Sequence, residues 1–192
     1  MEYNAFMGFD PEKYGEKVAH ILALDGDRLT SLTCAPCTNT KARRLLAAHA
    51  PAELFPRAKE PETAMSGLWL HFSCFEEAHQ LADASKSAEG ALWHGIVHRH
   101  EPDYGNAAYW FRRAGNHATF PDTARAASGI LKGNPDVEFR VGRWDPYSFI
   151  AFCERSTSPS ETVSRSVFGI SMPIALRPGM GERMRTSFDA TA

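Results

Sequence analysis

The sequence predicts a mainly all-α fold, a compact bundle of antiparallel helix hairpins followed by a loosely packed C-terminal tail. Helix-starting residues and short connections through the middle of the chain favour antiparallel neighbours. With 192 residues the chain can bury one core. We expect a helical domain over residues 1–155 and a poorly structured tail over 156–192 with one short apolar segment. The helical spacing i, i+3, i+4 and i+7 is clearest for Met65, Leu68, Trp69 and Phe72.

The first part of the chain predicts two helices and one further turn. Asp10-Pro11 has the form of an N-cap followed by proline at the first helical position, which predicts a helix over 11–24. A short helix is predicted over 40–49, and another helical turn follows Pro51. The stretch 25–38 is left unassigned, because its LTSLTC segment is compatible with a strand or a loop.

Four consecutive helices are predicted in the middle of the chain. The first follows Pro61 and carries the apolar stripe. Ser73 stands three residues before Glu76, a capping-box pattern that predicts the start of the second helix. Ser87 and Asp103 are the expected N-caps of the third and fourth helices. The expected ends of the last three helices are Ala84, Glu101 before Pro102, and Gly115.

The remaining part of the chain gives weaker patterns. A helix is predicted over 123–131, and VEFRV at 137–141 is expected to be a brief extended piece. Asp145-Pro146 repeats the N-cap-then-proline pattern and opens an apolar helix. From Ser156 onward the composition is polar and interrupted by Gly and Pro, and only VFGISMPIAL has enough apolar content to pack.

Charge and composition narrow the range of partners. The 21 basic residues nearly balance the 23 acidic ones, for a formal net charge of −2. No overall electrostatic field would therefore attract the protein to nucleic acid or to an anionic membrane. No apolar run approaches the roughly 20 residues that span a bilayer, and the N-terminus lacks the pattern of a signal peptide. No P-loop, dinucleotide fingerprint or nucleophile elbow is present. We expect a cytoplasmic protein with no nucleic-acid or membrane partner.

The four cysteines form no dense framework in a chain of this length. Cys34 and Cys37 have the thioredoxin-type spacing, but the strand and helix alternation of that fold is missing around them. We expect two free thiols there, with a redox or zinc-clip role as the alternative. Cys74 and Cys153 lie within apolar helical patterns and are expected to be core residues.

The segment from Trp93 to His117 holds four of the chain's eight histidines together with three arginines. On a helical wheel the histidines of the third helix lie opposite its apolar arc, and the fourth helix also has a polar face. If the two polar faces meet, they form a pocket. The predicted ligand-binding residues are His94, His98, Glu101, Asn106, Tyr109, Trp110, Arg113 and His117.

Two chemical uses fit these residues. His94 and His98 are spaced i, i+4 and could hold a divalent metal such as zinc, with Glu101 or His117 as the third ligand. Alternatively, arginine, asparagine and histidine side chains could bind an anionic or polar small molecule, with Trp110 as a stacking surface. A third interpretation is that the two imidazoles are simply solvated. The nearby indole argues against it, because an indole is rarely left in water without a use.

Two resemblances accompany these patterns. Ala91–Ala114 resembles a single Sel1-like repeat, a relative of the tetratricopeptide hairpin, although Asn106 stands where that repeat has Lys and the linker is shorter. GALWHGIVHRHEPDYGNAAYWFRRAGNH and the later WDPYSFIAFCE resemble a family of uncharacterised bacterial and fungal helical proteins, over roughly Pro61–Glu154. That family has no assigned activity, so the resemblance implies a helical fold alone.

The function that the sequence favours is a helical binding or interaction domain with a polar His/Arg/Trp pocket for a small anionic ligand or peptide. The alternative is a metal- or histidine-assisted hydrolytic enzyme. His94 or His98 would then act as the base and Arg113 as the anion stabiliser.

Overall fold

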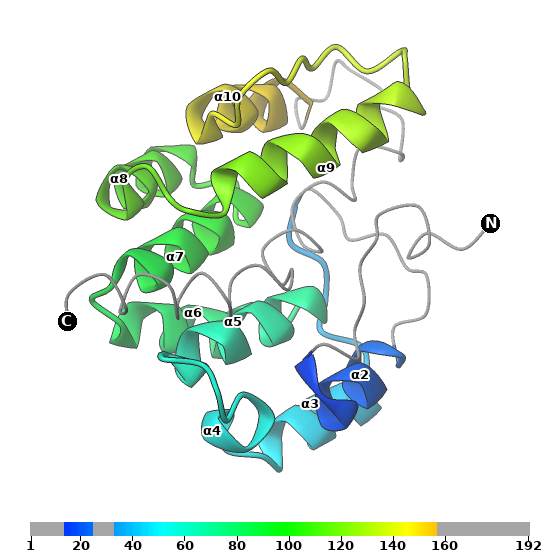
Figure 1. Ribbon diagram of the computed structural model, residues 1–192, viewed down its shortest axis with the longest axis vertical. Helices are drawn as coiled ribbons and strands as arrows, with labels where there is room; N and C mark the ends of the chain where they lie inside the picture. Colours follow the sequence, from blue (N-terminus) through cyan, green and yellow to red (C-terminus); the bar gives the residue numbers. More distant parts are fainter. Residues whose placement is uncertain (1–13, 25–32, 157–192) are drawn as a thin grey trace, which may run out of the picture.

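The computed structural model describes residues 14–24 and 33–156, and within these ranges the chain is helical, as predicted (Figure 1). The VEFRV segment, expected to be extended, forms no strand there, because it has no neighbouring strand to pair with. The helices are α2 (Glu16–Leu22), α3 (Thr40–Ala47), α4 (Pro51–Leu54), α5 (Pro61–His71), α6 (Phe75–Ala84), α7 (Ala88–His100), α8 (Tyr104–Ala114), α9 (Phe120–Lys132) and α10 (Pro146–Ser156).

Helices α5 to α8 form the middle of the molecule. Each of them packs on the next along the chain, so that α7 contacts both α6 and α8. In Figure 1, α2, α3 and α4 lie at one end of this group, and α9 and α10 lie at the other. α10 packs on α8. The Sel1-like geometry of the α7–α8 hairpin stays a prediction.

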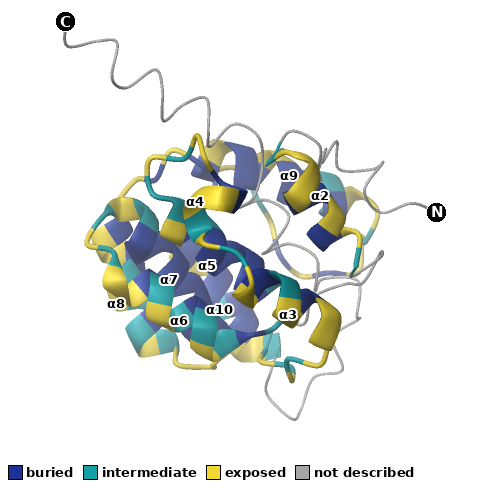
Figure 2. Cartoon of the chain, turned by 90° about the horizontal axis from the view of Figure 1, so that it is seen from below, coloured by how far each residue is buried: buried dark blue, intermediate teal, exposed yellow. Residues whose placement is uncertain are grey.

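Helix α7 is buried on all sides. Every residue from Gly90 to His100 is buried, including the polar side chains on the face opposite its apolar arc. Figure 2 shows α7 inside the molecule, while outer helices such as α3 carry exposed residues. The polar face of α7 is therefore turned toward other helices and away from bulk solvent.

Most predicted helix starts are confirmed. The Ser87 hydroxyl accepts a hydrogen bond from the amide of Gly90 at 3.0 Å, and the Asp103 carboxylate accepts one from the amide of Asn106 at 3.2 Å. The Asp145 carboxylate accepts from the amides of the first turn of α10.

The predicted capping box before α6 is wrong. Ser73 has a φ of 61° and lies outside the helix, and Cys74 is the N-cap, without a side-chain hydrogen bond. The helix predicted over 123–131 begins earlier, at Phe120, because Pro121 takes a first-turn position where proline is well tolerated. The predicted start at Pro11 and the tail beyond Ser156 lie outside the described residues.

A disulfide joins Cys37 to Cys74, with the two Cα atoms 4.7 Å apart. The expectation that Cys37 is a free thiol is thus wrong. Its partner is Cys74, which precedes α6 and is buried, as predicted. The neighbouring Cys34 is free and exposed. The bond ties the segment before α3 to the start of α6. Cys153 is free and buried, as predicted.

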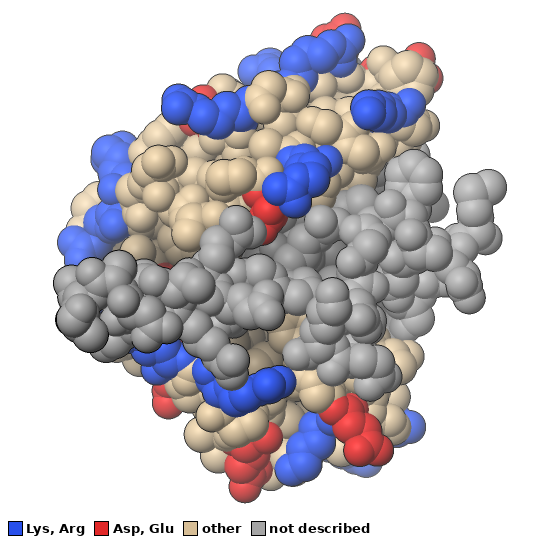
Figure 3. Space-filling model, in the orientation of Figure 1, with Lys and Arg blue, Asp and Glu red and all other residues tan. Residues whose placement is uncertain are grey.

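The surface seen in Figure 3 carries Lys and Arg side chains as separate groups, with acidic side chains between some of them. Within residues 14–24 and 33–156, none of the helices combines the length and apolar character needed to cross a membrane.

We predict opposite effects for two Gly-to-Ala substitutions. A Cβ at Gly90 would lie 2.5 Å from the Cβ of Ser85 and 2.9 Å from its carbonyl oxygen, so Gly90→Ala should lower the free energy of unfolding by about 1–3 kcal/mol. Gly129, inside α9, has no atom within 4 Å of such a Cβ. Gly129→Ala should therefore raise stability by up to about 1 kcal/mol, measured by urea denaturation. A loss of stability in both variants would contradict the contact as the cause.

We also predict that reduction of the Cys37–Cys74 bond destabilises the fold. The bond closes a loop across a sequence separation of 37 residues, and its loss should cost about 2–4 kcal/mol through the greater freedom of the unfolded chain. The same loss is expected for Cys37→Ala, whereas Cys34→Ser should leave the urea midpoint unchanged. Mass spectrometry after alkylation would refute the pairing if it found Cys34 protected.

Candidate metal centre

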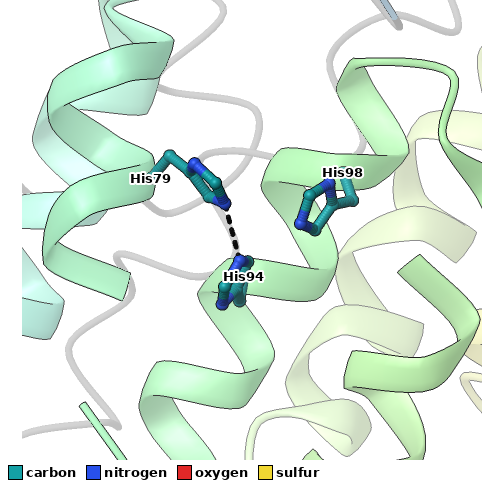
Figure 4. Close-up of side chains that lie close together, drawn as sticks. All are labelled: His79, His94 and His98. Carbon is teal, nitrogen blue, oxygen red and sulfur yellow. Dashed lines mark hydrogen bonds between the residues drawn. The ribbon is translucent and has the colours of Figure 1, made fainter. Parts of the chain in front are cut away.

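Three histidine side chains from two helices converge at one point between α6 and α7 (Figure 4). His79 comes from α6, and His94 and His98 come from α7. One ring nitrogen of each lies within 4.8 Å of those of the other two. The shortest separation is 2.7 Å, between Nε2 of His79 and Nε2 of His94.

The helices determine this geometry. The i, i+4 spacing places His94 and His98 one turn apart on the same face of α7, with their rings stacked at 4.8 Å between centroids. Because α6 packs on α7, the ring of His79 meets both of them edge-on, at 4.6 and 5.0 Å. Figure 4 shows His79 projecting from α6 toward the two α7 rings.

Helix α8 closes the opposite side of the cluster. The indole of Trp110 stacks on the ring of His94, with centroids 3.9 Å apart and planes at 16°. This approach requires a small residue on α7. A Cβ at Gly95 would lie 3.1 Å from the ring of Phe111 on α8, so glycine allows the two helices to lie close together.

The outer nitrogens of the α7 histidines face carboxylates. Nδ1 of His98 lies 3.0 Å from Oε2 of Glu101 and 3.8 Å from Oδ2 of Asp103. Nδ1 of His94 lies 3.9 Å from Oδ1 of Asp83. The close Glu101 carboxylate favours the tautomer in which Nδ1 of His98 carries the proton and donates it.

The opposite nitrogen of His98 is then an acceptor. The side-chain amide of Asn106, on α8, lies within reach, and its Nδ2 donates to Nε2 of His98 at 3.1 Å. The same Nδ2 also lies 3.5 Å from Nδ1, so the closer contact of Glu101 with Nδ1 decides the tautomer. In that tautomer Nε2 carries the lone pair that would bind a metal ion, and a bound ion would displace the amide of Asn106 from it.

The two histidines on α7 have lowered pKa values. Burial lowers the pKa of His94 to about 4, and the neighbouring imidazoles of His79 and His98 act in the same direction. Burial also lowers the pKa of His98, although the carboxylate of Glu101 opposes the shift. Neutral imidazoles are the form in which histidine binds metals, so no proton has to be displaced from a charged ring at pH 7.

The structure brings together five of the eight predicted site residues: His94, His98, Glu101, Asn106 and Trp110. The other three lie apart from the imidazoles. Tyr109 is 45 % exposed and contacts the edge of the Trp110 ring. The exposed Arg113 has its guanidinium 5.4 Å from the Trp110 ring centroid. His117 lies before α9, where its Nδ1 is 2.9 Å from the hydroxyl of Thr119.

The predicted third ligand needs correction. Neither Glu101 nor His117 joins His94 and His98 in the cluster of possible metal ligands, and His79 takes that place. Glu101 is held instead by the outer nitrogen of His98. The sequence contains one indication of His79: it lies four residues after Phe75 and three before Ala82, two apolar residues of the same helix.

The comparisons with protein-family models, with curated proteins and with solved structures found no match to this chain.

We predict that the metal-free protein loses stability as the pH falls from 7 to 5. Burial lowers the pKa of His71 to about 4 and also lowers the pKa of His100 and His117, so these rings are neutral when folded and take up protons on unfolding. Their stabilising effect is complete above the unfolded pKa of about 6.5 and is lost toward the lower folded pKa.

Each such proton should cost about 1.4 kcal/mol per pH unit, measured by urea denaturation with a chelator present. His71→Gln, outside the metal cluster, should make the decline shallower by about one proton. A free energy of unfolding that is constant between pH 7 and 5 would contradict the burial of these rings.

Proposed function

We propose that this chain is a helical metal-binding protein whose centre is formed by His79, His94 and His98. The observation that carries the proposal is the convergence of three imidazole nitrogens within 4.8 Å of one another. Burying several polar rings against each other costs free energy unless they gain a partner, and a divalent ion satisfies all three at once.

The separations suit a tetrahedral ion. Ligand nitrogens about 2.0–2.1 Å from a zinc ion at tetrahedral angles lie about 3.3 Å apart. The shortest separation here is 2.7 Å, between His79 and His94, and the remaining ones are no longer than 4.8 Å. An ion would move the closest pair apart by about 0.6 Å, a shift that side-chain rotation can supply.

The carboxylates outside the cluster support the same proposal. Histidine ligands in metal centres usually donate their second N–H to a carboxylate, which fixes the ring and raises its basicity. Glu101 is in this position for His98, at 3.0 Å. Asp83 is on the corresponding side of His94, although it is more distant, at 3.9 Å.

The donor set indicates the class of ion. Imidazole nitrogens suit zinc, copper, nickel and iron, whereas magnesium and calcium prefer oxygen ligands. We therefore expect a divalent transition metal, with zinc as the first candidate.

A small anionic ligand or a peptide is the second candidate for this region. It is favoured by the layered arrangement of His94, Trp110 and Arg113, which ends in an exposed guanidinium. Binding of this kind at Arg113 needs no metal, so a chelator separates the two candidates.

A cytoplasmic location stays a prediction. The Cys37–Cys74 disulfide argues against it, because such bonds persist mainly in oxidising compartments.

We predict that the full chain, stripped with a chelator, binds one equivalent of zinc in isothermal titration calorimetry and does not bind magnesium. Zinc at 100 times its dissociation constant should add about 2.7 kcal/mol to the free energy of unfolding, because the ion binds the folded site. His79→Ala, His94→Ala and His98→Ala should each weaken binding by more than about 100-fold, beyond the loss expected for an outer-shell partner.

One further variant tests the carboxylate outside the cluster, and another serves as the control. Glu101→Gln should weaken zinc binding by about 10- to 100-fold, because it removes the carboxylate acceptor at Nδ1 of His98. His20→Ala removes an exposed imidazole on α2 and should leave the affinity unchanged. Equal affinity in the wild-type protein and in His94→Ala would rule out this centre.

A further inference from the structure

We propose that the Cys37–Cys74 disulfide controls the metal affinity of the His79–His94–His98 centre, so that the ion is held while the bond is intact and is released when thiols reduce it. This inference rests on the proposed function, since it requires the ion. It adds a form of regulation, by the redox state of the surroundings, and it names thiol reductants as the class of molecule that triggers release.

The metal ligands lie on a helix hairpin. α6 and α7 are joined at one end by residues 85–87. At the other end Phe75, the first residue of α6, meets His100, the last residue of α7, with their ring centroids 5.7 Å apart. One of the three ligands lies on α6 and two lie on α7, so the ligand set is complete only while the two helices stay together.

The segment before α3 fastens the open end of this hairpin. The backbone amide of Cys34 donates to the carbonyl oxygen of His100, at the end of α7, at 2.8 Å. Three residues later, Cys37 is bonded to Cys74, the residue directly before α6. One short stretch of chain therefore connects the end of α7 to the start of α6, and the disulfide is the covalent part of that connection.

The start of α6 depends on this bond for support. Its N-cap, Cys74, makes no side-chain hydrogen bond to the first turn, and Ser73 before it has a left-handed φ of 61°. A helix of 10 residues is marginal unless its surroundings stabilise it. His79 follows Cys74 within about one and a half turns. A ligand displaced by about 0.5 Å already disturbs a metal site, so a looser start of α6 weakens the centre.

Cys34 is the free thiol nearest in sequence to the bond, but it does not open it. Partial burial of the sulfur, together with the charge of Glu101, raises the pKa of Cys34 to about 11, so this thiol is protonated at neutral pH. The thiolate is the form that attacks a disulfide. The bond therefore persists beside Cys34 until an external thiol reacts with it.

The reduction consumes two external thiols. The thiolate of the first attacks Sγ of Cys37, which is partly exposed, whereas Cys74 is buried. The bond between the two cysteines breaks, and Cys74 leaves as a thiolate and takes up a proton. The second thiol attacks the external sulfur of the mixed disulfide, and Cys37 leaves and is protonated. Two external thiols thus become one disulfide, and the disulfide of the protein becomes two thiols.

The first test compares the zinc affinity of two full-length variants that differ only in the bond. Cys34→Ser keeps the bond, whereas Cys34→Ser/Cys37→Ala lacks it and has no neighbouring thiol to replace it. The affinity is measured by competition with a chromophoric chelator, at a temperature where circular dichroism shows both variants to be folded. We expect binding to be weaker by about 10-fold or more without the bond. Equal affinities would overturn the inference.

Ile130→Ala is the matched control for a general loss of stability. Ile130 is buried on α9, outside the hairpin, and its truncation should destabilise the fold by about as much as loss of the bond does. This variant should bind zinc with the affinity of the wild type. An equally large loss of affinity in Ile130→Ala would show that zinc binding follows overall stability, and it would overturn the role of the bond.

The second test uses the wild-type chain and depends on no destabilised variant. If the bond strengthens zinc binding, bound zinc must stabilise the bond by the same factor. In a glutathione redox buffer, saturating free zinc should therefore shift the equilibrium about 10-fold toward the intact bond, measured by alkylation and mass spectrometry. His98→Ala should remove the shift. Zinc that favours reduction, by capturing the released thiolates, would overturn the inference.

The failures are distinguishable. Absence of zinc binding in Cys34→Ser, which keeps the bond and all three histidines, overturns both this inference and the proposed function. Zinc binding of equal strength with and without the bond overturns the inference alone. If the variant without the bond does not fold, the equilibrium in the glutathione buffer decides, and an equilibrium that does not respond to zinc overturns the inference.

Discussion

Helix α7 is packed between α6 and α8, so the polar side chains on its second face must find partners inside the protein. A buried imidazole without a hydrogen bond costs of the order of 1–3 kcal/mol. His94 turns one nitrogen to His79, but for its other nitrogen the described part of the chain offers no acceptor closer than Asp83 at 3.9 Å. The packing of α7 between α6 and α8 thus determines where the cluster lies. If stability were their only role, these histidines would cost free energy.

The approach of α8 to α7 connects this burial to the chemistry. Gly95 lets the ring of Phe111 come within 3.1 Å of where a Cβ would lie, and Phe111 follows Trp110 directly on α8. The indole thereby reaches His94, and one turn earlier Asn106 reaches His98. The small residue at position 95 therefore helps α8 to bring Trp110 and Asn106 within reach of the α7 histidines.

The sequence contains enough information for the elements and for part of the site. Caps such as Ser87 and Asp103 act through residues three positions away, and the pair His94 and His98 lies one turn apart on one helix, so local spacing predicts both. Ser73 shows the limit of such patterns, because its left-handed backbone removes it from the capping position.

Features that depend on tertiary pairing were not predictable in this way. His79 joins the cluster only because α6 packs on a particular face of α7, and Cys37 meets Cys74 because α5 packs back on α3 and α4. Both relationships join residues that no helical period connects. His117 and Arg113 are close in sequence to the central pair, but they do not contact its imidazoles. The guanidinium of Arg113 lies over the Trp110 ring, and His117 lies before α9 beside Thr119.

Gly95 on α7 is also part of a sequence pattern by which distant relatives of this chain would be recognised. If five side chains from α6, α7 and α8 and the close approach of α8 to α7 define the centre, the pattern H-x14-H-G-x2-H-x7-N-x3-W, which runs from His79 to Trp110, describes it in sequence. A genome search with these six letters would collect proteins by their metal chemistry, where overall similarity has faded.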